Sequence, residues 1–211
     1  MFADRREAGR KLGEVVAGLK LDDPLVLALP RGGVPVGFEV AQRLGAPLDV
    51  LLVRKLGTPG QRELAMGAIV GGASPQVVFN DAIIAESRIS PRTIDAEITA
   101  QRAELERRRR AYGGPDVPVS GRTVVLVDDG VATGASARAA LLGLRQAGAA
   151  RLVLAVPVGA ADAIATLGKL ADEVVCLLIP DRFQAVGEWY GRFDQTSDEE
   201  VMALLGRKAA P

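Results

Sequence analysis

The strongest constraint on the fold is the run from Val124 to Ser136, which reads VVLVDDGVATGAS. Its first four residues are aliphatic, and a strand that is apolar on both faces is typical of a parallel sheet covered by helices on each side. Two adjacent acids, Asp128 and Asp129, end the strand, and a loop of small residues leads into a predicted helix. The run therefore favours an α/β fold with a ligand site beyond the carboxyl end of a buried strand.

The same run has the chemistry of a sugar phosphate site. Backbone N–H groups at a helix N-terminus attract phosphate. Two carboxylates beside that phosphate would repel it, but they accept hydrogen bonds, and the neighbouring hydroxyls of a sugar supply two donors. The alternative is a strand–turn–helix junction in which Asp, Thr and Ser side chains only cap the helix. The complete pattern favours the sugar phosphate.

The rest of the chain repeats the strand–helix order of a parallel sheet. Further apolar strands are predicted at residues 24–29, 48–53, 152–156 and 174–179, and helices at residues 4–19, 36–44, 90–112, 137–147 and 160–170, with a last helix opened by 197–200. Residues 54–62 are predicted to be a polar loop, and 64–70 with 76–79 a hairpin or strand pair. We expect one α/β domain with a doubly wound, mostly parallel sheet (about 24–179), a mostly helical insertion (about 80–115) and a C-terminal appendage (about 180–211).

Composition excludes several kinds of catalysis. The chain has no histidine, which excludes Ser-His-Asp and Cys-His catalysis, and its single Cys176 lies in an apolar run where packing is expected. One cysteine forms no internal disulfide, which favours a reducing cytoplasm. Lys plus Arg and Asp plus Glu both total 26, so no global field favours nucleic acid or a membrane. We expect no signal peptide and no membrane span, because residues 1–18 are charged and no apolar run is long enough.

The run from Val124 to Ser136 resembles the motif with which type I phosphoribosyltransferases bind phosphoribosyl diphosphate (PRPP). The resemblance implies that Asp128 and Asp129 bind the ribose 2′ and 3′ hydroxyls. It also implies that the following loop wraps the 5′-phosphate, through Ala132, Thr133, Gly134, Ala135 and Ser136. Gly130 departs from the family pattern, which often has an aliphatic residue there. Ala132 stands where hypoxanthine/guanine enzymes carry a proton-handling aspartate, which counts against a 6-oxopurine acceptor or against that mechanism.

A second segment, Pro30-Arg31-Gly32-Gly33, follows a predicted strand and precedes a predicted helix. Arginine has a planar guanidinium that is always charged, and two glycines allow a backbone to approach a diphosphate closely. Family members carry a short pyrophosphate loop here, often with a non-proline cis peptide. The resemblance therefore implies that Arg31, Gly32 and Gly33 bind the leaving diphosphate, while a plain turn is the alternative.

A third segment, Arg54 to Gly57, is similar to the entry into the flexible loop of adenine phosphoribosyltransferases. Such a loop closes over the diphosphate and excludes water. Arg54 and Lys55 are thus candidate catalytic residues in contact with the diphosphate. Glu63, with Arg62 beside it, is the candidate general acid/base, although Ala65 falls where the adenine enzymes have their glutamate if Met66-Gly67 is aligned.

Four of the eight aromatic residues cluster near the C-terminus: Phe183, Trp189, Tyr190 and Phe193. Family members place a variable hood over the sheet edge, where rings stack on the base. The candidate base-binding residues are Asp181, Phe183, Trp189 and Tyr190, and Glu188 is a further hydrogen-bonding candidate. A small satellite core or a dimer contact explains the rings equally well.

The function implied by the resemblance is transfer of ribose-5-phosphate from PRPP to a nitrogenous base. Mg²⁺ is expected to bind through the phosphates of PRPP rather than in a protein site of its own, with Asp128 and Asp129 as candidate ligands. The alternative is a regulatory protein that senses PRPP or a nucleotide without turnover. The partners expected are PRPP and a base, without nucleic acid or membrane, and dimers are common in the family. The run Arg107 to Arg110 follows three glutamates and favours a solvated helix end over a nucleic-acid site.

Overall fold

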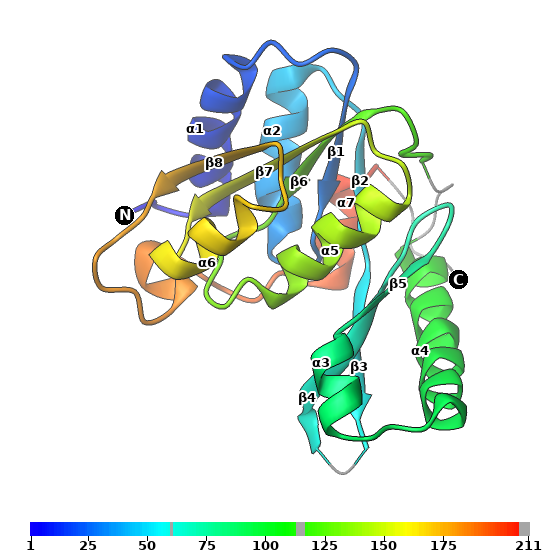
Figure 1. The fold of residues 1–211 in the computed structure, drawn as a ribbon. Coiled ribbons are helices and arrows are strands. Elements are labelled where there is room, and N and C mark those ends of the chain that lie inside the picture. Colours follow the sequence, from blue (N-terminus) through cyan, green and yellow to red (C-terminus); the bar gives the residue numbers. More distant parts are fainter. Residues whose placement is uncertain (60, 113–116, 207–211) are drawn as a thin grey trace.

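A parallel sheet forms the centre of the computed structural model, which describes residues 1–59, 61–112 and 117–206, with only the backbone of 61–63. Its strand order is β2-β1-β6-β7-β8 (Figure 1). The strands are β1 (Pro24–Ala28), β2 (Leu48–Val50), β6 (Thr123–Val127), β7 (Arg151–Val158) and β8 (Glu173–Leu178). Strands β1 and β6 are direct neighbours, with Ala28 opposite Val127. The loops that follow these two strands therefore leave the sheet side by side.

Helices cover both faces of this sheet, as the apolar strands predicted. Helices α1 (Arg5–Ala17) and α2 (Gly33–Leu44) lie on one face, and α5 (Ala135–Gln146) and α6 (Ala161–Leu167) on the other. Alternate residues of β6 point to opposite faces of the sheet. Val125 and Val127 pack with α1 and α2, while Val124 and Leu126 pack with α5. The predicted doubly wound α/β fold is confirmed.

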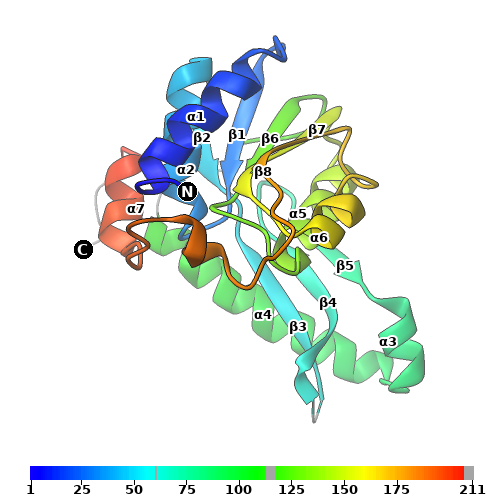
Figure 2. The same ribbon diagram turned by 90° about the vertical axis from the view of Figure 1, so that its left-hand side faces the viewer.

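A second sheet projects from the core as an arm (Figure 2). We use "arm" for residues 53–112, which contain the antiparallel strands β3 (Val53–Thr58), β4 (Gln61–Val70) and β5 (Gln76–Phe79), followed by α3 (Asp81–Glu86) and α4 (Pro91–Tyr112). The prediction of a polar loop at 54–62 is wrong, because most of it forms the β3–β4 hairpin. Leu56 and Thr58 are buried there between polar or small neighbours, and Leu56 packs in the same cluster as Leu105 of α4.

The C-terminal segment contains the short 3-10 helix η1 (Val186–Trp189) and α7 (Asp198–Leu204). Ser197 caps α7 by accepting a hydrogen bond from Glu200 N at 3.2 Å, as its sequence predicted. Cys176 of β8 is half-buried, and burial raises the pKa of its thiol to about 11, so it is a packed thiol at neutral pH. Within the described residues, no helix combines the length and apolar character needed to cross a membrane.

Candidate active site

The two acids predicted to bind ribose lie immediately after β6, against the loop that follows β1. A hydrogen bond from Leu29 N to Val127 O, 2.9 Å long, extends the β1–β6 pairing up to these loops. A Cβ added at Gly32 would overlap Oδ2 of Asp129, so the carboxylate rests on the glycine backbone. The peptide bond between Pro30 and Arg31 is cis. The predicted ribose and diphosphate segments are therefore in direct contact.

Burial dominates the electrostatics of the acid pair. It raises the pKa of Asp128 well above its ordinary value, and the neighbouring Asp129 charge raises it further. Burial also raises the pKa of Asp129, while the Arg5 guanidinium opposes this rise. The Nε of Arg5 lies 2.8 Å from Asp129 Oδ2, and Asp129 N donates to Asp128 Oδ1 at 2.9 Å. Arg5 is thus the counter-charge of a buried acid, and no sequence motif pointed to it.

Two helix N-termini flank these acids. Helix α2 begins after Gly32 and helix α5 after Gly134, which has a φ of 74°, and neither has a side-chain cap. Thr133 Oγ1 is 3.5 Å from Ala135 N, at the limit of a hydrogen bond. In contrast, Asp4, Asn80 and Ser197 accept hydrogen bonds at the starts of α1, α3 and α7. The site therefore offers two positively polarised helix ends, one on each side of a carboxylate pair.

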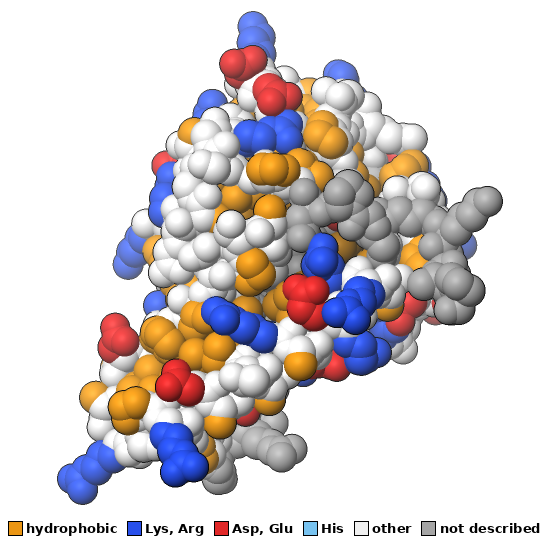
Figure 3. All heavy atoms as spheres, turned by 90° about the vertical axis from the view of Figure 1, so that its right-hand side faces the viewer, with side chains coloured by type: hydrophobic (Ala, Val, Ile, Leu, Met, Phe, Trp, Pro, Cys, Tyr) orange, Lys and Arg blue, Asp and Glu red, His pale blue; other side chains and the backbone are white. Residues whose placement is uncertain are grey.

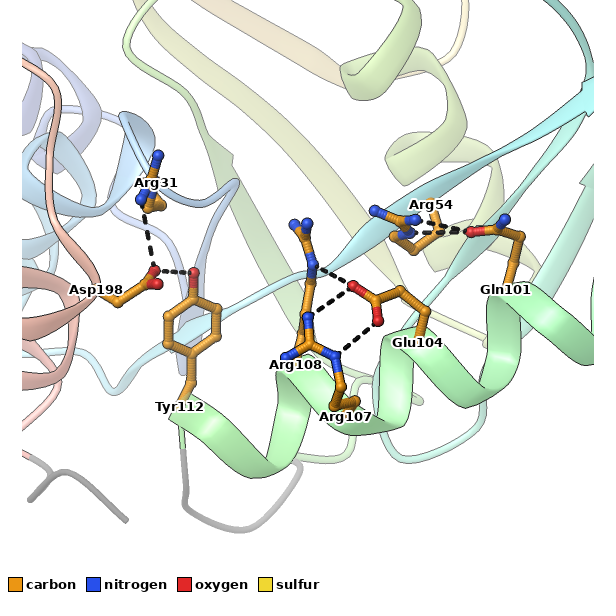
Figure 4. Close-up of polar contacts among 8 residues, drawn as sticks. All are labelled: Arg31, Arg54, Gln101, Glu104, Arg107, Arg108, Tyr112 and Asp198. Atoms are coloured by element: carbon orange, nitrogen blue, oxygen red, sulfur yellow. Dashed lines mark hydrogen bonds and ion pairs between the residues drawn. The ribbon is translucent and has the colours of Figure 1, made fainter. Parts of the chain in front are cut away.

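Arg31 lies where the loop after β1 meets α4 and α7 (Figure 4). Its Nη1 is 3.9 Å from Oδ1 of Asp198, and the hydroxyl of Tyr112 donates to that same oxygen at 2.8 Å. Burial and the Asp198 carboxylate raise the pKa of Tyr112 to about 12. Asp198 thus lies between Arg31 and Tyr112, and it connects three segments that are far apart in the sequence.

The candidate pair Arg54 and Lys55 is split between the two faces of the arm, because successive strand residues point in opposite directions. Arg54 donates from Nε and Nη2 to Oε1 of Gln101 on α4, at 3.1 and 2.9 Å (Figure 4). Lys55 instead lines a cavity of about 390 Å³ together with Ser136 at the start of α5 and Ala65 of β4. The structure therefore brings Lys55, and not Arg54, to the predicted 5′-phosphate loop.

The candidate acid/base Glu63 and its neighbour Arg62 belong to β4, but their side chains lie outside the described residues. Ala65, which takes the place of the adenine-enzyme glutamate when Met66-Gly67 is aligned, is a described lining residue of the Lys55 cavity. A methyl group transfers no proton, so this position supplies no acid/base group.

The C-terminal rings form a satellite core that reaches the acid pair. Tyr190 is 6% exposed, its ring centre is 5.6 Å from that of Phe2 and 5.0 Å from that of Phe193, and its hydroxyl donates to the Asp129 carbonyl oxygen. Phe183 and Trp189 pack half-buried against the same cluster, whereas Asp181 is exposed. From the sequence, the rings are either a surface that stacks on a base or a small satellite core. The contacts of Tyr190 fit the satellite core.

Gly130 stands where family members often have an aliphatic residue, and the structure gives a physical reason for the glycine that the sequence did not reveal. A Cβ at this position would lie 2.5 Å from Cγ1 of Val186 and 3.0 Å from Cγ1 of Val158. Val186 of η1 therefore fills the space into which an aliphatic side chain at position 130 would project. The C-terminal segment from residue 180 onward, which we call the hood, interlocks with the loop after β6 at this point.

The arginine run on α4 lies on the face shown in Figure 3, where basic and acidic side chains are interspersed. Arg107 and Arg108 both donate to Glu104, at 2.7 and 3.0 Å, and Arg109 donates to Glu106 at 3.3 Å. The hydrogen bonds from Arg107 and Arg108 lower the pKa of Glu104 to about 2. Three of the four arginines thus form ion pairs with glutamates of the same helix, in agreement with the predicted solvated helix end.

The acid pair is the donor set that the site offers to a metal ion. Its carboxylate oxygens suit a hard cation such as Mg²⁺. Across the described ranges, no three His, Cys, Asp or Glu side chains are grouped so as to hold a metal on their own. The residues present therefore fit a metal that shares its coordination with the phosphates of a ligand.

Comparison with known proteins agrees with this geometry. The phosphoribosyl transferase domain family matches residues 5–192. Two relatives from Mycobacterium tuberculosis strains, each named "putative phosphoribosyl transferase", are 50% identical over 209 residues, which is 98% of this chain and 47% of each relative. The chain therefore spans about half the length of the curated relatives it matches.

Solved structures extend the comparison. The protein TT1426 from Thermus thermophilus has a TM-score of 0.83 and 46% identity, with 97% of both chains covered. The AQ2163 protein from Aquifex aeolicus shares the fold alone, with a TM-score of 0.51 and 12% identity over 87% of this chain and 78% of that protein. Because the family matches across most of its length, the chain belongs to the phosphoribosyl transferase family.

Proposed function

We propose that the protein transfers ribose-5-phosphate from PRPP to a nitrogenous base and releases diphosphate. The observation that carries this proposal is the contact between Gly32 and Asp129, flanked by the uncapped starts of α2 and α5. A ligand that has a vicinal diol between two separate phosphate groups matches two anion positions on either side of a carboxylate pair.

In this proposal each segment has one task. Asp128 and Asp129 accept hydrogen bonds from the ribose hydroxyls, and the loop Ala132 to Ser136 at the start of α5 holds the 5′-phosphate. Arg31, with the backbone of Gly32 and Gly33, holds the diphosphate. Mg²⁺ bound to the diphosphate would neutralise part of the charge that develops on it, with the acid pair as the nearby carboxylates.

The chemical step is a substitution at C1 of the ribose. The bond from C1 to the diphosphate oxygen breaks, its electron pair leaves with the diphosphate, and a nitrogen lone pair of the base forms the new bond to C1. Positive charge develops on the sugar as the old bond at C1 breaks and before the new bond is complete. Positioning of the reactants and electrostatic stabilisation of the leaving group therefore supply most of the catalysis. The nitrogen then loses its proton, for which Glu63 is our candidate acceptor. Lys55 is placed beside the phosphate loop, whereas Arg54 must leave Gln101 to reach a diphosphate.

The proposal is tested by isothermal titration with PRPP and Mg²⁺, followed by diphosphate release across a panel of purine and pyrimidine bases. We expect binding that Asp129→Asn weakens and that Asp22→Asn, a change at an exposed acid, leaves intact. Binding without turnover on any base would favour the sensing protein instead. Absence of PRPP binding would reject both functions.

The role of Glu63 is tested separately once an acceptor base has been identified. We expect Glu63→Gln to lower kcat by about 10²-fold or more, in the range typical of a lost general acid/base. Binding of PRPP should be unchanged, because the amide keeps the size of the side chain. Full turnover by Glu63→Gln would remove this residue from the mechanism.

A further inference from the structure

Arg5, the first residue of α1, is held by contacts with two separate segments, the loop after β6 and residues 193–194. Its Nε donates to Asp129 Oδ2 at 2.8 Å, and its Nη1 donates to the carbonyl oxygen of Asp194 at 2.7 Å. Its guanidinium carbon lies 3.9 Å from the ring centre of Phe193. The Arg5 and Asp129 side chains are only 12% and 14% exposed. A guanidinium fixed by two hydrogen bonds and a ring face has a defined orientation.

The acid pair is arranged so that the protein holds one oxygen of each carboxylate. Oδ2 of Asp129 lies against Arg5 and the Gly32 backbone, and Oδ1 of Asp128 accepts the Asp129 N–H. Within the part of the chain that the structure describes, no hydrogen bond from another residue reaches Asp129 Oδ1 or Asp128 Oδ2. Each carboxylate therefore keeps one acceptor oxygen for a ligand.

We propose that Arg5 is a positioning residue for sugar recognition: it fixes Asp129 so that Oδ1 accepts a ribose hydroxyl. This inference rests on the proposed function, since it assumes that the acid pair binds the sugar. It adds a residue 124 positions away from Asp129 in sequence, on a helix that carries none of the family's phosphate-binding segments. Arg5 does not itself touch the reacting atoms in this role.

The structure also allows the opposite effect, in which Arg5 occupies a carboxylate that the ligand needs. The two effects differ in sign: a positioning arginine strengthens sugar binding, and a competing arginine weakens it. Asp129 Oδ1 is left available by the observed contact, which is why we favour positioning.

The experiment compares two probes by isothermal titration. Ribose 5-phosphate has both the phosphate and the hydroxyls, whereas inorganic phosphate has only the first. We expect Arg5→Gln to weaken ribose 5-phosphate binding about tenfold, the size of one lost charge-assisted hydrogen bond, and to change phosphate binding by less than about twofold. Arg5→Lys retains the positive charge but lacks the planar guanidinium, so its affinity for ribose 5-phosphate should lie between those of wild type and Arg5→Gln.

Arg6→Gln is the matched control. Arg6 is the next residue of the same helix and forms an ion pair of 3.0 Å with Glu39, away from the acid pair. Arg6→Gln shows how much the loss of any arginine from α1 changes binding. We expect its affinity for ribose 5-phosphate to match that of wild type. Phe193→Leu removes the ring under the Arg5 guanidinium and should weaken ribose 5-phosphate binding in the same direction as Arg5→Gln.

Folding of each variant is followed through the emission of Trp189, the single tryptophan, whose carbonyl accepts a hydrogen bond from Phe2 N at 2.7 Å. If wild type does not bind PRPP, the proposed function fails. If wild type binds PRPP and ribose 5-phosphate, and folded Arg5→Gln and Arg5→Lys bind ribose 5-phosphate equally well or more tightly, the positioning role of Arg5 is overturned while the proposed function stands.

Discussion

At the scale of single residues, Gly32 is required by a carboxylate rather than by its backbone angles. Its φ of −61° and ψ of −34° are ordinary helical values that any residue adopts. What excludes a side chain is Asp129, whose Oδ2 occupies the position of a Cβ. From the sequence, the two glycines of this loop are explained by the close approach of a diphosphate to the backbone. The structure adds that one of them, Gly32, also makes room for Asp129, the acid that we propose binds the sugar.

We therefore expect Gly32→Ala to displace Asp129 and to weaken ribose 5-phosphate binding about tenfold or more, with an overpacking cost of about 1–3 kcal/mol in stability. Titration calorimetry and urea unfolding measure the two effects. Gly168→Ala is the control: Gly168 has a φ of −61° and a Cβ there would lie 3.4 Å from its nearest neighbour, so the change should be nearly neutral. Wild-type affinity in Gly32→Ala would contradict the packing argument.

Tyr112 gives a pH-dependent test of the contact beside Arg31. Its folded pKa of about 12 is raised above the ordinary value of 10.0. The protonated phenol is therefore favoured by folding, and its contribution to stability is complete below pH 10 and is lost as the pH rises through 12. The pKa of the other tyrosine, Tyr190, is also raised by burial, so the folded protein should form little phenolate near pH 10, as measured by ultraviolet absorbance.

Removing the negative charge should shift this titration. Asp198→Asn leaves an acceptor but no carboxylate, so we expect Tyr112 to ionise at lower pH than in wild type. Tyr112→Phe identifies which part of the absorbance change belongs to this residue. An unchanged curve in Asp198→Asn would show that the Tyr112–Asp198 bond contributes nothing in solution.

At the scale of elements, the strands that are apolar on both faces were predictable, and so were the β4–β5 pair and α4 of the arm, whereas β3 was not. Val124 to Val127 is apolar on both faces because helices cover both sides of β6, and such a run has few alternatives. Strand β3 is half-buried and contains Arg54, Lys55 and Gly57, so its pattern resembles a loop. The sequence predicted that the acid pair and the Arg31 loop each follow a strand, and the structure shows that they are in contact. It did not separate Arg54 from Lys55, which depends on the strand's two faces, or find Arg5, which depends on packing between distant segments.

The interlock of η1 with the loop after β6 makes a prediction about a pair of residues. Gly130→Ala should destabilise the protein by about 1–3 kcal/mol, because the new methyl group meets Val186 at 2.5 Å. Val186→Ala vacates that space, so the double variant should be more stable than the sum of the two single effects predicts. Urea unfolding of the four proteins in this cycle measures the coupling. Additive effects would mean that the two elements do not meet as the structure has them.

At the scale of the whole molecule, segments from the two ends of the described chain close over the acid pair. Phe2 N donates to Trp189 O at 2.7 Å, and Gly191 N and Arg192 N donate to Phe2 O and Ala3 O at 2.7 and 2.9 Å. Phe2 is only 4% exposed, in the cluster that contains Tyr190. Arg5 follows directly from this segment. The position of its guanidinium at Asp129 therefore depends on the packing of the hood, so we expect stability and the proposed sugar binding to be linked.

This link is tested by Phe2→Ala. Loss of a buried phenyl ring should lower the free energy of unfolding by about 3–5 kcal/mol, and the loosened hood should shift Trp189 emission to longer wavelength. Because Arg5 loses its support, ribose 5-phosphate binding should weaken as well. Phe79→Ala is the control, since Phe79 is 41% exposed on the arm; it should cost less stability and leave the emission of Trp189 unchanged. If Phe2→Ala lowers stability but retains wild-type affinity for ribose 5-phosphate, the hood stabilises the fold without positioning Arg5.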